Sequence, residues 1–276
     1  MNELKLQEVL KQFFIEDIGE QDISSESIFS FQDRGIAVLT AKESGVFCGE
    51  KVITNGFYLM DSNSNVQMLK HDGETVEKGE DLAIIKGPIR SILQGERVIL
   101  NLIQRMSGIA TITKKAVDTL NSKHTRICDT RKTTPGLRMF EKYAVRCGGG
   151  FNHRLGLYDG VMIKDNHIAF CGSITEAVQK VRSQIGHMVK IEVEIETKEQ
   201  LLEAIDSKVD IIMFDNCSPQ KVKEFVRLTP SQIITEASGG IGFHNLADYR
   251  DTNVDYISLG FLTHSVKSLD ISLNVK

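Results

Sequence analysis

The first part of the chain alternates between strand-like and helix-like hydrophobic patterns. Short apolar runs bounded by polar or turn-forming residues predict strands at residues 36–41, 66–70 and 82–86. Apolar residues at helical spacing predict helices at residues 3–14 and 50–60. The polar stretch 17–30 is predicted to be a loop, and 71–73 a turn. This order favours an N-terminal α/β sandwich with an antiparallel sheet.

Residues 91–121 keep helical spacing of apolar residues over an unusually long stretch. Gly108 lies inside it, and a glycine in a helix interior costs about 1 kcal/mol relative to alanine. The pattern therefore predicts one long helix or two abutting helices with a break at Gly108. Arg97 falls on the polar face. We place the domain boundary here, with a first domain at 1–110 and a second at 111–276.

From residue 125 the pattern changes to short apolar runs separated by helical segments. The runs cover residues 126–128, 161–163, 189–195, 211–214, 233–237 and 256–259. The helical segments cover residues 137–145, 174–185, 198–205, 220–228 and 246–250. Apolar strands spaced by helices are typical of parallel strands buried on both faces. The second domain is therefore predicted to be an incomplete parallel α/β barrel of six or seven strands.

Polar or glycine-rich segments follow these runs at nearly every strand end. They are Asp129–Lys132, Lys164–His167, Glu194, Asp215, Ser238–Gly240 and Gly260. In parallel barrels, ligand groups project from the C-terminal ends of the strands. Taken singly, Glu194 fits an ion pair in the barrel core, Asp215 a turn and Ser238–Gly240 a tight loop. Their repetition at one end of the barrel favours a shared site.

Composition and charge exclude several classes of protein. The chain has 276 residues, a formal net charge of −4, 41% hydrophobic and 25% charged residues, which is ordinary for a globular protein. An acidic chain is not expected to bind nucleic acid. Five cysteines without a C-x-x-C pair favour reduced thiols. No apolar run reaches membrane-spanning length, and neither a P-loop nor a G-x-G-x-x-G motif occurs. We expect a soluble, cytoplasmic protein.

Residues 129–168 carry an excess of Lys and Arg over Asp and Glu, although the whole chain is acidic. The stretch also contains three consecutive glycines, 148–150. Arginine presents a planar fork to carboxylate or phosphate, and glycine lets the backbone approach a ligand closely. A solvated helix face is the plainer explanation, but it would not need the glycines. The stretch therefore predicts a site for a small, multiply anionic ligand.

The same stretch carries long motifs that resemble a known family. They are DTRKTTPGLR at 129–138, EKYAVRCGGGFNHRLGLYDG at 141–160 and IKDNH at 163–167, continued by EVEIET, FDN, EASGG and ISLGFLTHS. Together they resemble quinolinate phosphoribosyltransferase, the decarboxylating nicotinate-nucleotide pyrophosphorylase family. The resemblance covers nearly the whole chain and is weakest over residues 1–85.

The resemblance implies a reaction and a set of site residues. A pentosyltransferase of this family converts quinolinate and phosphoribosyl pyrophosphate to nicotinate mononucleotide, pyrophosphate and carbon dioxide in NAD biosynthesis, with Mg²⁺. Lys132, Glu194 and Asp215 are the implied catalytic residues. The implied substrate-binding residues are Arg97, Thr130, Arg131, Lys132, His153, Arg154, Lys164, Glu194, Asp215, Ser238, Gly239, Gly240, Leu259, Gly260 and Phe261. His153 would contact a carboxylate of the substrate or orient Arg154. The resemblance does not assign the residues that bind Mg²⁺.

The family also implies a homodimer, or a higher oligomer, in which Arg97 enters the site of the neighbouring subunit. From the residues alone, Arg97 is equally a charge on a helix surface.

Three alternatives stay open at this stage. The molybdenum-transport-associated relative shares the fold, but we expect it to lack an intact IKDNH. Nicotinate or nicotinamide phosphoribosyltransferases act on substrates without the second carboxylate, for which three arginines would be excessive. A non-catalytic barrel that binds a phosphorylated metabolite would gain nothing from Glu194 and Asp215 facing an anion. Release of carbon dioxide separates the quinolinate reaction from all three.

Overall fold

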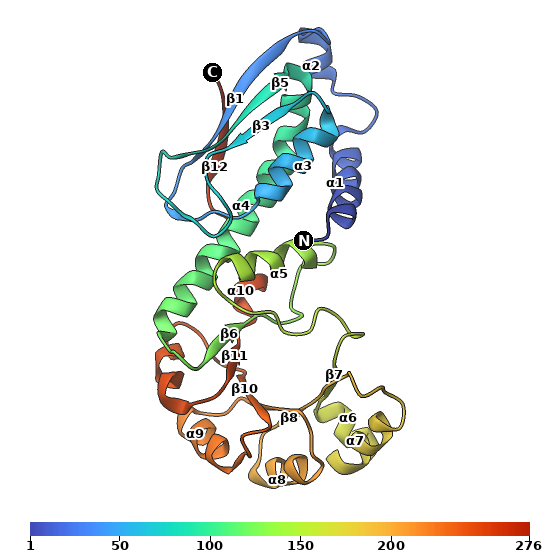
Figure 1. Cartoon of the computed structure of the whole chain (residues 1–276), viewed down its shortest axis with the longest axis vertical. Helices are drawn as coiled ribbons and strands as arrows, with labels where there is room; N and C mark the ends of the chain where they lie inside the picture. The colour runs from blue at the N-terminus through green and yellow to red at the C-terminus, as the bar shows by residue number, and fades with distance from the viewer. The chain divides into compact units, whose positions relative to one another are not determined.

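The computed structural model describes residues 1–276 and divides them into two compact units. Unit 1 consists of Met1–Lys114, Pro135–Gly149 and Ser265–Lys276, and unit 2 of Lys115–Thr134 and Gly150–His264 (Figure 1). The contiguous domains predicted from the sequence, 1–110 and 111–276, differ from this division. The reason is that two later segments return to unit 1, one as a strand of its sheet and one as a helix.

Unit 1 is built on a four-stranded antiparallel sheet, as the sequence predicted. Its strand order is β12-β1-β5-β3. The strands are β1 (Arg34–Ala41), β3 (Asn65–Met68), β5 (Asp81–Pro88) and β12 (Ile271–Val275), and β2 (Gly45–Val46) pairs with β4 (Thr75–Val76) in a second sheet. The last strand pairs with β1 from Ala37↔Val275 to Ala41↔Ile271. The C-terminal segment therefore completes the first sheet.

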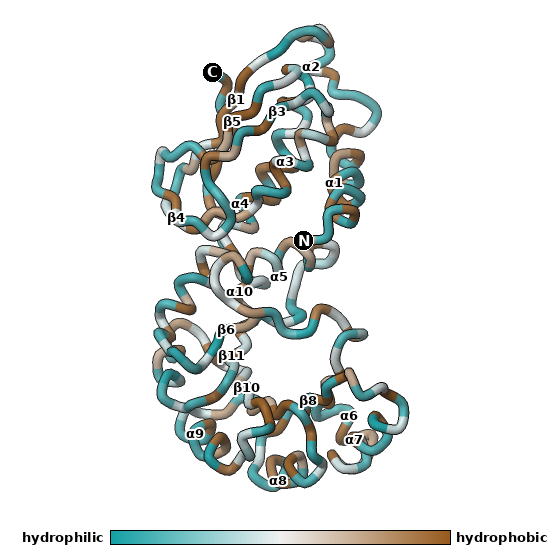
Figure 2. The backbone as a smooth tube through the Cα atoms, in the orientation of Figure 1, coloured by the Kyte–Doolittle hydropathy of each residue, from teal (hydrophilic) through white to brown (hydrophobic).

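Four helices of unit 1 are α1 (Glu3–Ile18), α2 (Ile23–Ile28), α3 (Glu50–Met60) and α5 (Arg138–Cys147). Of these, α1, α3 and α5 bury apolar residues, whereas α2 buries only Ser25. Leu6, Leu10 and Phe14 are buried on α1, and Figure 2 shows the mixture of hydrophobic and hydrophilic residues along α1 and α3. The prediction of a loop over residues 17–30 was wrong, because Asp22 caps α2 by accepting from the Ser24 and Ser25 backbone N–H groups.

Helix α4 (Ile89–Leu120) is one continuous helix of 32 residues, so the first of the two predicted alternatives is confirmed and Gly108 does not break the helix. A Cβ at position 108 would collide with the backbone carbonyl of Lys267. Gly108 is therefore required by the close approach of another chain segment, a role that local propensity does not reveal. No helix of the structure has both the length and the hydropathy needed to cross a bilayer.

Unit 2 is a six-stranded parallel sheet in the order β6-β11-β10-β9-β8-β7. The strands are β6 (Arg126–Cys128), β7 (Val161–Ile163), β8 (Ile191–Ile195), β9 (Ile211–Asp215), β10 (Ile234–Ser238) and β11 (Tyr256–Ser258). Figure 1 shows them in an arc with α7, α8 and α9 on its outer side. The ends of the order, β6 and β7, are not paired with each other. The prediction of an incomplete parallel α/β barrel is confirmed, with six strands.

The helices of unit 2 are α6 (Asp165–Cys171), α7 (Ile174–Arg182), α8 (Lys198–Asp206), α9 (Pro219–Leu228), the 3-10 helix η1 (Leu246–Thr252) and α10 (Phe261–His264). They match the predicted segments with two additions, α6 and α10. The sequence suggested a loop where α6 lies. Its first turn is closed by the Lys164 backbone N–H, which donates to His167 Nδ1 at 3.0 Å, a cap made by residues that are not usual capping types.

Candidate active site

A cavity of about 550 Å³ lies at the C-terminal ends of the barrel strands of unit 2. Its lining residues are Thr130, Arg131, Lys132, His153, Arg154, Met162, Lys164, Glu194, Met213, Asp215, Asn216, Ser238, Gly239, Gly240 and Ser258. Most of the residues singled out in the sequence therefore meet in one place. Four lining residues were missed: Met162, Met213, Asn216 and Ser258. The two methionines belong to apolar runs that read as core, and Asn216 and Ser258 stand beside predicted residues and carry no charge.

The strands place these side chains by their register. Lys164 follows β7 directly, Glu194 is next to last in β8, and Asp215 and Ser238 end β9 and β10. Asp215 pairs with Ser238, and Glu194 with Met213. Because successive strands of the barrel are parallel, these ends lie at the same edge.

Two carboxylates and one lysine face each other in the cavity. Lys164 Nζ lies 2.8 Å from Glu194 Oε2, with side-chain exposures of 44% and 15%. Burial raises the pKa of Asp215, and the negative charges of Glu194 and Glu196 raise it further. A partly buried carboxylate beside other negative charges is unfavourable. The arrangement suits a ligand that brings positive charge to the carboxylates.

The glycine loop after β10 is shaped by backbone conformations that favour glycine. Gly239 and Gly240 have φ values of +83° and +64°. A Cβ at Gly239 would also collide with Asn216, whose backbone N–H donates to the Ser238 carbonyl at 2.9 Å. The loop therefore keeps its backbone open to the cavity, as expected for binding oxygen-rich anions.

Two arginines give the cavity its positive side. Burial lowers the pKa of Arg154, and the charge of Arg131 lowers it further, which shows that the two guanidinium groups are close enough to interact. Arg154 Nη1 donates to the Gly160 carbonyl at 2.9 Å. Nearby cations repel each other unless an anion lies between them. A dicarboxylate meets this condition.

His153 is anchored below the cavity on both its backbone and its ring. Its backbone N–H donates to Oδ1 of the fully buried Asp129 at 2.9 Å. Its Nδ1 accepts from the Arg154 backbone N–H at 2.8 Å. Its Nε2 lies 3.0 Å from Glu192 Oε2 and 3.6 Å from Glu236 Oε1. The ring therefore engages its neighbours through both nitrogens, and Glu192 and Glu236 are residues that the sequence analysis did not single out.

Four predicted residues do not line this cavity. Leu259 is buried and its backbone N–H donates to the Cys128 carbonyl at 2.9 Å. Gly260 lies against Lys132, whose Cδ would be 3.0 Å from a Cβ there. The Phe261 ring packs on Phe243 with centroids 5.1 Å apart. Arg97 lies on α4 in unit 1, with a side chain 60% exposed and 3.9 Å from Glu96.

The run of three glycines has a different role from the one expected. A Cβ at Gly148 would collide with the Ala110 carbonyl of α4. The first glycine of the run therefore allows α5 to end against the helix backbone within unit 1, and no ligand is needed to explain it.

Two groups of side chains have spacings that would suit a metal ion, namely Cys48, Asp72 and Cys147 in unit 1 and His153, Glu192 and Glu236 in unit 2. In the first group Asp72 is already engaged. Its Oδ2 accepts from the Tyr143 hydroxyl at 2.7 Å, and its Oδ1 accepts from the Gly49 and Glu50 backbone N–H groups that begin α3. Asp72 is thus explained as a helix cap.

Comparison with known proteins bears directly on this cavity. Family models of the quinolinate phosphoribosyl transferase N-terminal and C-terminal domains match residues 22–107 and 109–274. The chain belongs to the quinolinate phosphoribosyltransferase family. Together the two models cover most of its length, including each residue that lines the cavity. The boundary between them lies close to residue 110, whereas the compact units of the structure exchange segments across it.

Members of the family in distant organisms are similar over nearly the whole chain. The probable nicotinate-nucleotide pyrophosphorylase [carboxylating] of Bacillus subtilis is 59% identical, with coverage of 100% of this chain and 95% of that protein. The quinolinate phosphoribosyltransferase [decarboxylating] 2b of Nicotiana tabacum is 38% identical, covering 98% and 82%. The crystal structure of NadC from Streptococcus pyogenes is 39% identical, with a TM-score of 0.95 and coverage of 100% and 99%.

Proposed function

We propose that this family member transfers the phosphoribosyl group of phosphoribosyl pyrophosphate to quinolinate and releases carbon dioxide, giving nicotinate mononucleotide and pyrophosphate. The observation that carries the proposal is the cavity itself. It sets Arg131, Arg154 and Lys132 beside the carboxylates of Glu194 and Asp215 at the strand ends of one barrel. The reaction needs both signs of charge, because its substrates are anions and its transition state is cationic at the ribose.

Quinolinate would bind through its two adjacent carboxylates. Burying two anions without cations costs several kcal/mol each. Arg131 and Arg154 line the cavity and interact electrostatically, so a dicarboxylate relieves their mutual repulsion. Bidentate pairing of a guanidinium with a carboxylate gives orientation as well as affinity. In this assignment Arg131 and Arg154 form an arginine clamp for quinolinate. His153 supports this clamp mainly through its hydrogen bond with the Arg154 backbone.

The ribose and pyrophosphate would occupy the other side of the cavity. As the bond from the anomeric carbon to pyrophosphate breaks, positive charge grows on the sugar, and Glu194 and Asp215 stabilise it or hold the ribose hydroxyls. Lys132 and Lys164 bind phosphate oxygens as point charges. To do so, Lys164 gives up part of its ion pair with Glu194 and contacts the phosphate instead. Thr130 and the Ser238–Gly240 loop offer hydroxyl and backbone donors. Leu259–Phe261 would not contact the substrate with their side chains. Their backbone lies behind Lys132 and would support that side chain.

Magnesium would enter with the pyrophosphate group. Burial and the charges of Glu194 and Glu196 raise the pKa of Asp215, so a cation beside its carboxylate would relieve unfavourable electrostatics. Magnesium binds through one or two carboxylates together with phosphate oxygens and water, so these two side chains fit the ion. When bound, it would neutralise the leaving pyrophosphate.

Loss of carbon dioxide requires little further machinery. Once the ring nitrogen carries the ribose it is cationic. The electron pair that the departing carbon dioxide leaves on the adjacent carbon is stabilised beside this nitrogen and then takes up a proton. A pocket that excludes water and holds cations around the remaining carboxylate favours this step. We therefore assign no separate base to the decarboxylation.

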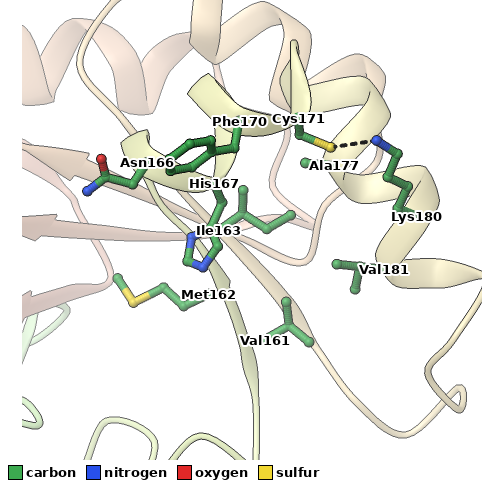
Figure 3. A pocket seen from close by; sticks show the side chains of 10 residues that line it. All are labelled: Val161, Met162, Ile163, Asn166, His167, Phe170, Cys171, Ala177, Lys180 and Val181. Carbon is green, nitrogen blue, oxygen red and sulfur yellow. Dashed lines mark hydrogen bonds between the residues drawn. The ribbon is translucent and has the colours of Figure 1, made fainter.

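The active form would be a homodimer or a higher oligomer in which Arg97 completes the partner's site. An apolar groove of about 600 Å³ supports this, because it lies on β7, the edge strand, beside α6 and α7 (Figure 3). Phe170 in its wall is 94% exposed. Met162 lines both this groove and the site cavity. A second copy that covers the groove would therefore also border the site.

Mixed subunits test the dimer. Arg97→Ala and Lys132→Ala proteins should each be inactive, and heterodimers of the two should regain activity, because one of their two sites then holds both residues. Heterodimers that form but stay inactive would place Arg97 outside the partner's site.

We also propose a cytoplasmic location, since all five cysteines are free thiols.

The reaction itself is tested with carboxyl-labelled quinolinate, phosphoribosyl pyrophosphate and Mg²⁺. We expect nicotinate mononucleotide and labelled carbon dioxide in equal amounts, both abolished without the phosphoribosyl donor. A folded protein that forms neither would overturn the substrate assignment and leave only the barrel fold.

A further inference from the structure

A second layer of charged side chains lies beneath the site cavity, inside the barrel. Glu192 precedes Glu194 by two residues on β8, and Glu236 precedes Ser238 by two residues on β10. Side chains two apart on a strand share a face, so both acids point into the barrel one layer lower. They are 4% and 5% exposed, and they approach His153 Nε2 at 3.0 and 3.6 Å. The proposed reaction gives them no role.

The hydrogen bonds of His153 determine which ring nitrogen carries the proton. Nδ1 accepts from the Arg154 backbone N–H at 2.8 Å, so it must keep its lone pair. In a neutral imidazole the proton is then on Nε2. That is the nitrogen directed at Glu192 Oε2, and the Glu236 carboxyl lies next to it. Glu192 is therefore placed to accept from this donor, whereas Glu236 Oε1, at 3.6 Å, lies just beyond hydrogen-bond distance.

The charge of the pair agrees with this arrangement. Burial raises the pKa of Glu236 to about 8, and the nearby Glu192 carboxyl adds to the effect. The Oε1 atoms of both acids are buried without a hydrogen-bond partner. Two carboxylates in one buried pocket do not both ionise readily. At neutral pH Glu236 therefore holds a proton and Glu192 is the acceptor that faces the imidazole.

A metal ion is the competing explanation, because the ligand atoms of the three residues lie within 4.8 Å of one another. A metal bound at Nε2 would require the proton of the ring to move to Nδ1. There it would meet the Arg154 backbone N–H, which already points at Nδ1. The hydrogen bond to Arg154 thus favours an internal proton network over a metal site.

We propose that Glu192 and Glu236 are positioning residues, which hold His153 as the Nε2–H tautomer and thereby orient the backbone and the guanidinium of Arg154. The chain of contacts runs from the acids to Nε2, from Nδ1 to the Arg154 N–H, and from Arg154 Nη1 to the Gly160 carbonyl. The inference rests on the proposed function in one respect only, that Arg154 binds quinolinate.

The tautomer is measured directly, without any assay of activity. In full-length protein labelled with ¹⁵N-histidine and checked to be free of bound metal, the imidazole shifts of His153 at pH 7.5 should be those of a neutral Nε2–H ring. The resonance is assigned with His153→Gln. An Nδ1–H ring, an imidazolium, or zinc or manganese retained in stoichiometric amount after dialysis would overturn the proposal.

Two substitutions at one position then test the consequence. Glu192→Leu removes the acceptor, whereas Glu192→Gln keeps an oxygen for Nε2–H and serves as the matched control. Glu192→Leu should shift the Arg154 backbone amide resonance and raise the quinolinate KM by at least about tenfold, while the KM for phosphoribosyl pyrophosphate changes by less than about twofold. Glu192→Gln should stay close to the wild type in both.

The two proposals fail in different ways. If the Arg154 amide shifts as expected but quinolinate is not turned over even by the wild type, the proposed function is wrong and the positioning role stands. If Glu192→Leu raises the KM for quinolinate and the KM for phosphoribosyl pyrophosphate equally, or leaves the Arg154 amide unmoved, the acids have only a structural role. If the Glu192→Leu protein does not fold, the His153 tautomer is measured in the wild type and in Glu236→Gln instead. An Nδ1–H ring in either protein refutes the proposal.

Discussion

Two layers of acidic residues in the same barrel differ in their surroundings and therefore in their chemistry. The upper layer, Glu194 and Asp215, lines the site cavity beside Lys164. The lower layer, Glu192 and Glu236, is buried around His153, and Glu236 holds a proton with a pKa of about 8. Residues on the same strand, two positions apart, thus line different cavities: Glu194 lines the site cavity, whereas Glu192 lines a second cavity of about 430 Å³ together with His153 and Glu236. Depth in the barrel decides whether an acid is available as charge or is held as part of a hydrogen-bonded scaffold.

The upper layer should show the largest effect on turnover. Glu194→Ala and Asp215→Ala should each lower kcat by about 100-fold, because each removes a charge that stabilises the cationic transition state. Steady-state kinetics with both substrates measures this. A loss confined to KM would show that the two acids bind the ground state only, and the contrast between the layers would disappear.

The arginine clamp above the lower layer should have the next largest effect. Arg131→Ala and Arg154→Ala should each raise the quinolinate KM by more than about tenfold, equal to roughly 1.4 kcal/mol of binding free energy. The KM for phosphoribosyl pyrophosphate is the internal control. If neither variant changes the quinolinate KM, the two arginines do not bind its carboxylates.

The glycine loop at the rim tests geometry without a change of charge. Gly239→Ala places a Cβ at a φ of +83° and against Asn216. Since such strain costs on the order of 1 kcal/mol, we expect the KM for phosphoribosyl pyrophosphate to rise about fivefold. Gly186→Ala, at a glycine with open space around its Cβ, is the control. Equal effects at both positions would argue against a phosphate-binding role for the loop.

Titration of Glu236 in the lower layer should make the free energy of unfolding depend on pH. Folded Glu236 keeps its proton up to a pKa of about 8, whereas the ordinary pKa of a glutamate carboxyl is 4.5. Between these values the folded state binds more protons, so the free energy of unfolding falls as the pH rises. Glu236→Gln, which resembles the protonated acid, should match the wild-type melting temperature at pH 5. At pH 8.5 it should exceed it by about 2 °C or more. A constant difference at all pH values would mean that Glu236 does not titrate in this window.

Much of this molecule could be predicted from the sequence because its signals are local. The six strands of the barrel were predicted from apolar runs, and their polar ends predicted where a site would form, since parallel strands share one end. The family and its fold follow from long motifs and are confirmed by the comparisons, and the proposed reaction rests on that family. Short helices such as α2 and α6 were missed, because six or seven residues are too few to show a hydrophobic period.

What the sequence alone determined is the set of charged and flexible residues and the ends of the strands that carry them. The tertiary structure decided which of those residues share an environment. EVEIET and EASGG place four polar side chains on two strands, but only the barrel sends Glu194 and Ser238 to the cavity and Glu192 and Glu236 into the core around His153. It likewise assigned Gly108 and Gly148 to close backbone contacts. The physical reason is that burial and neighbouring charges, which set the protonation of an acid and the space around a glycine, come from segments distant in sequence.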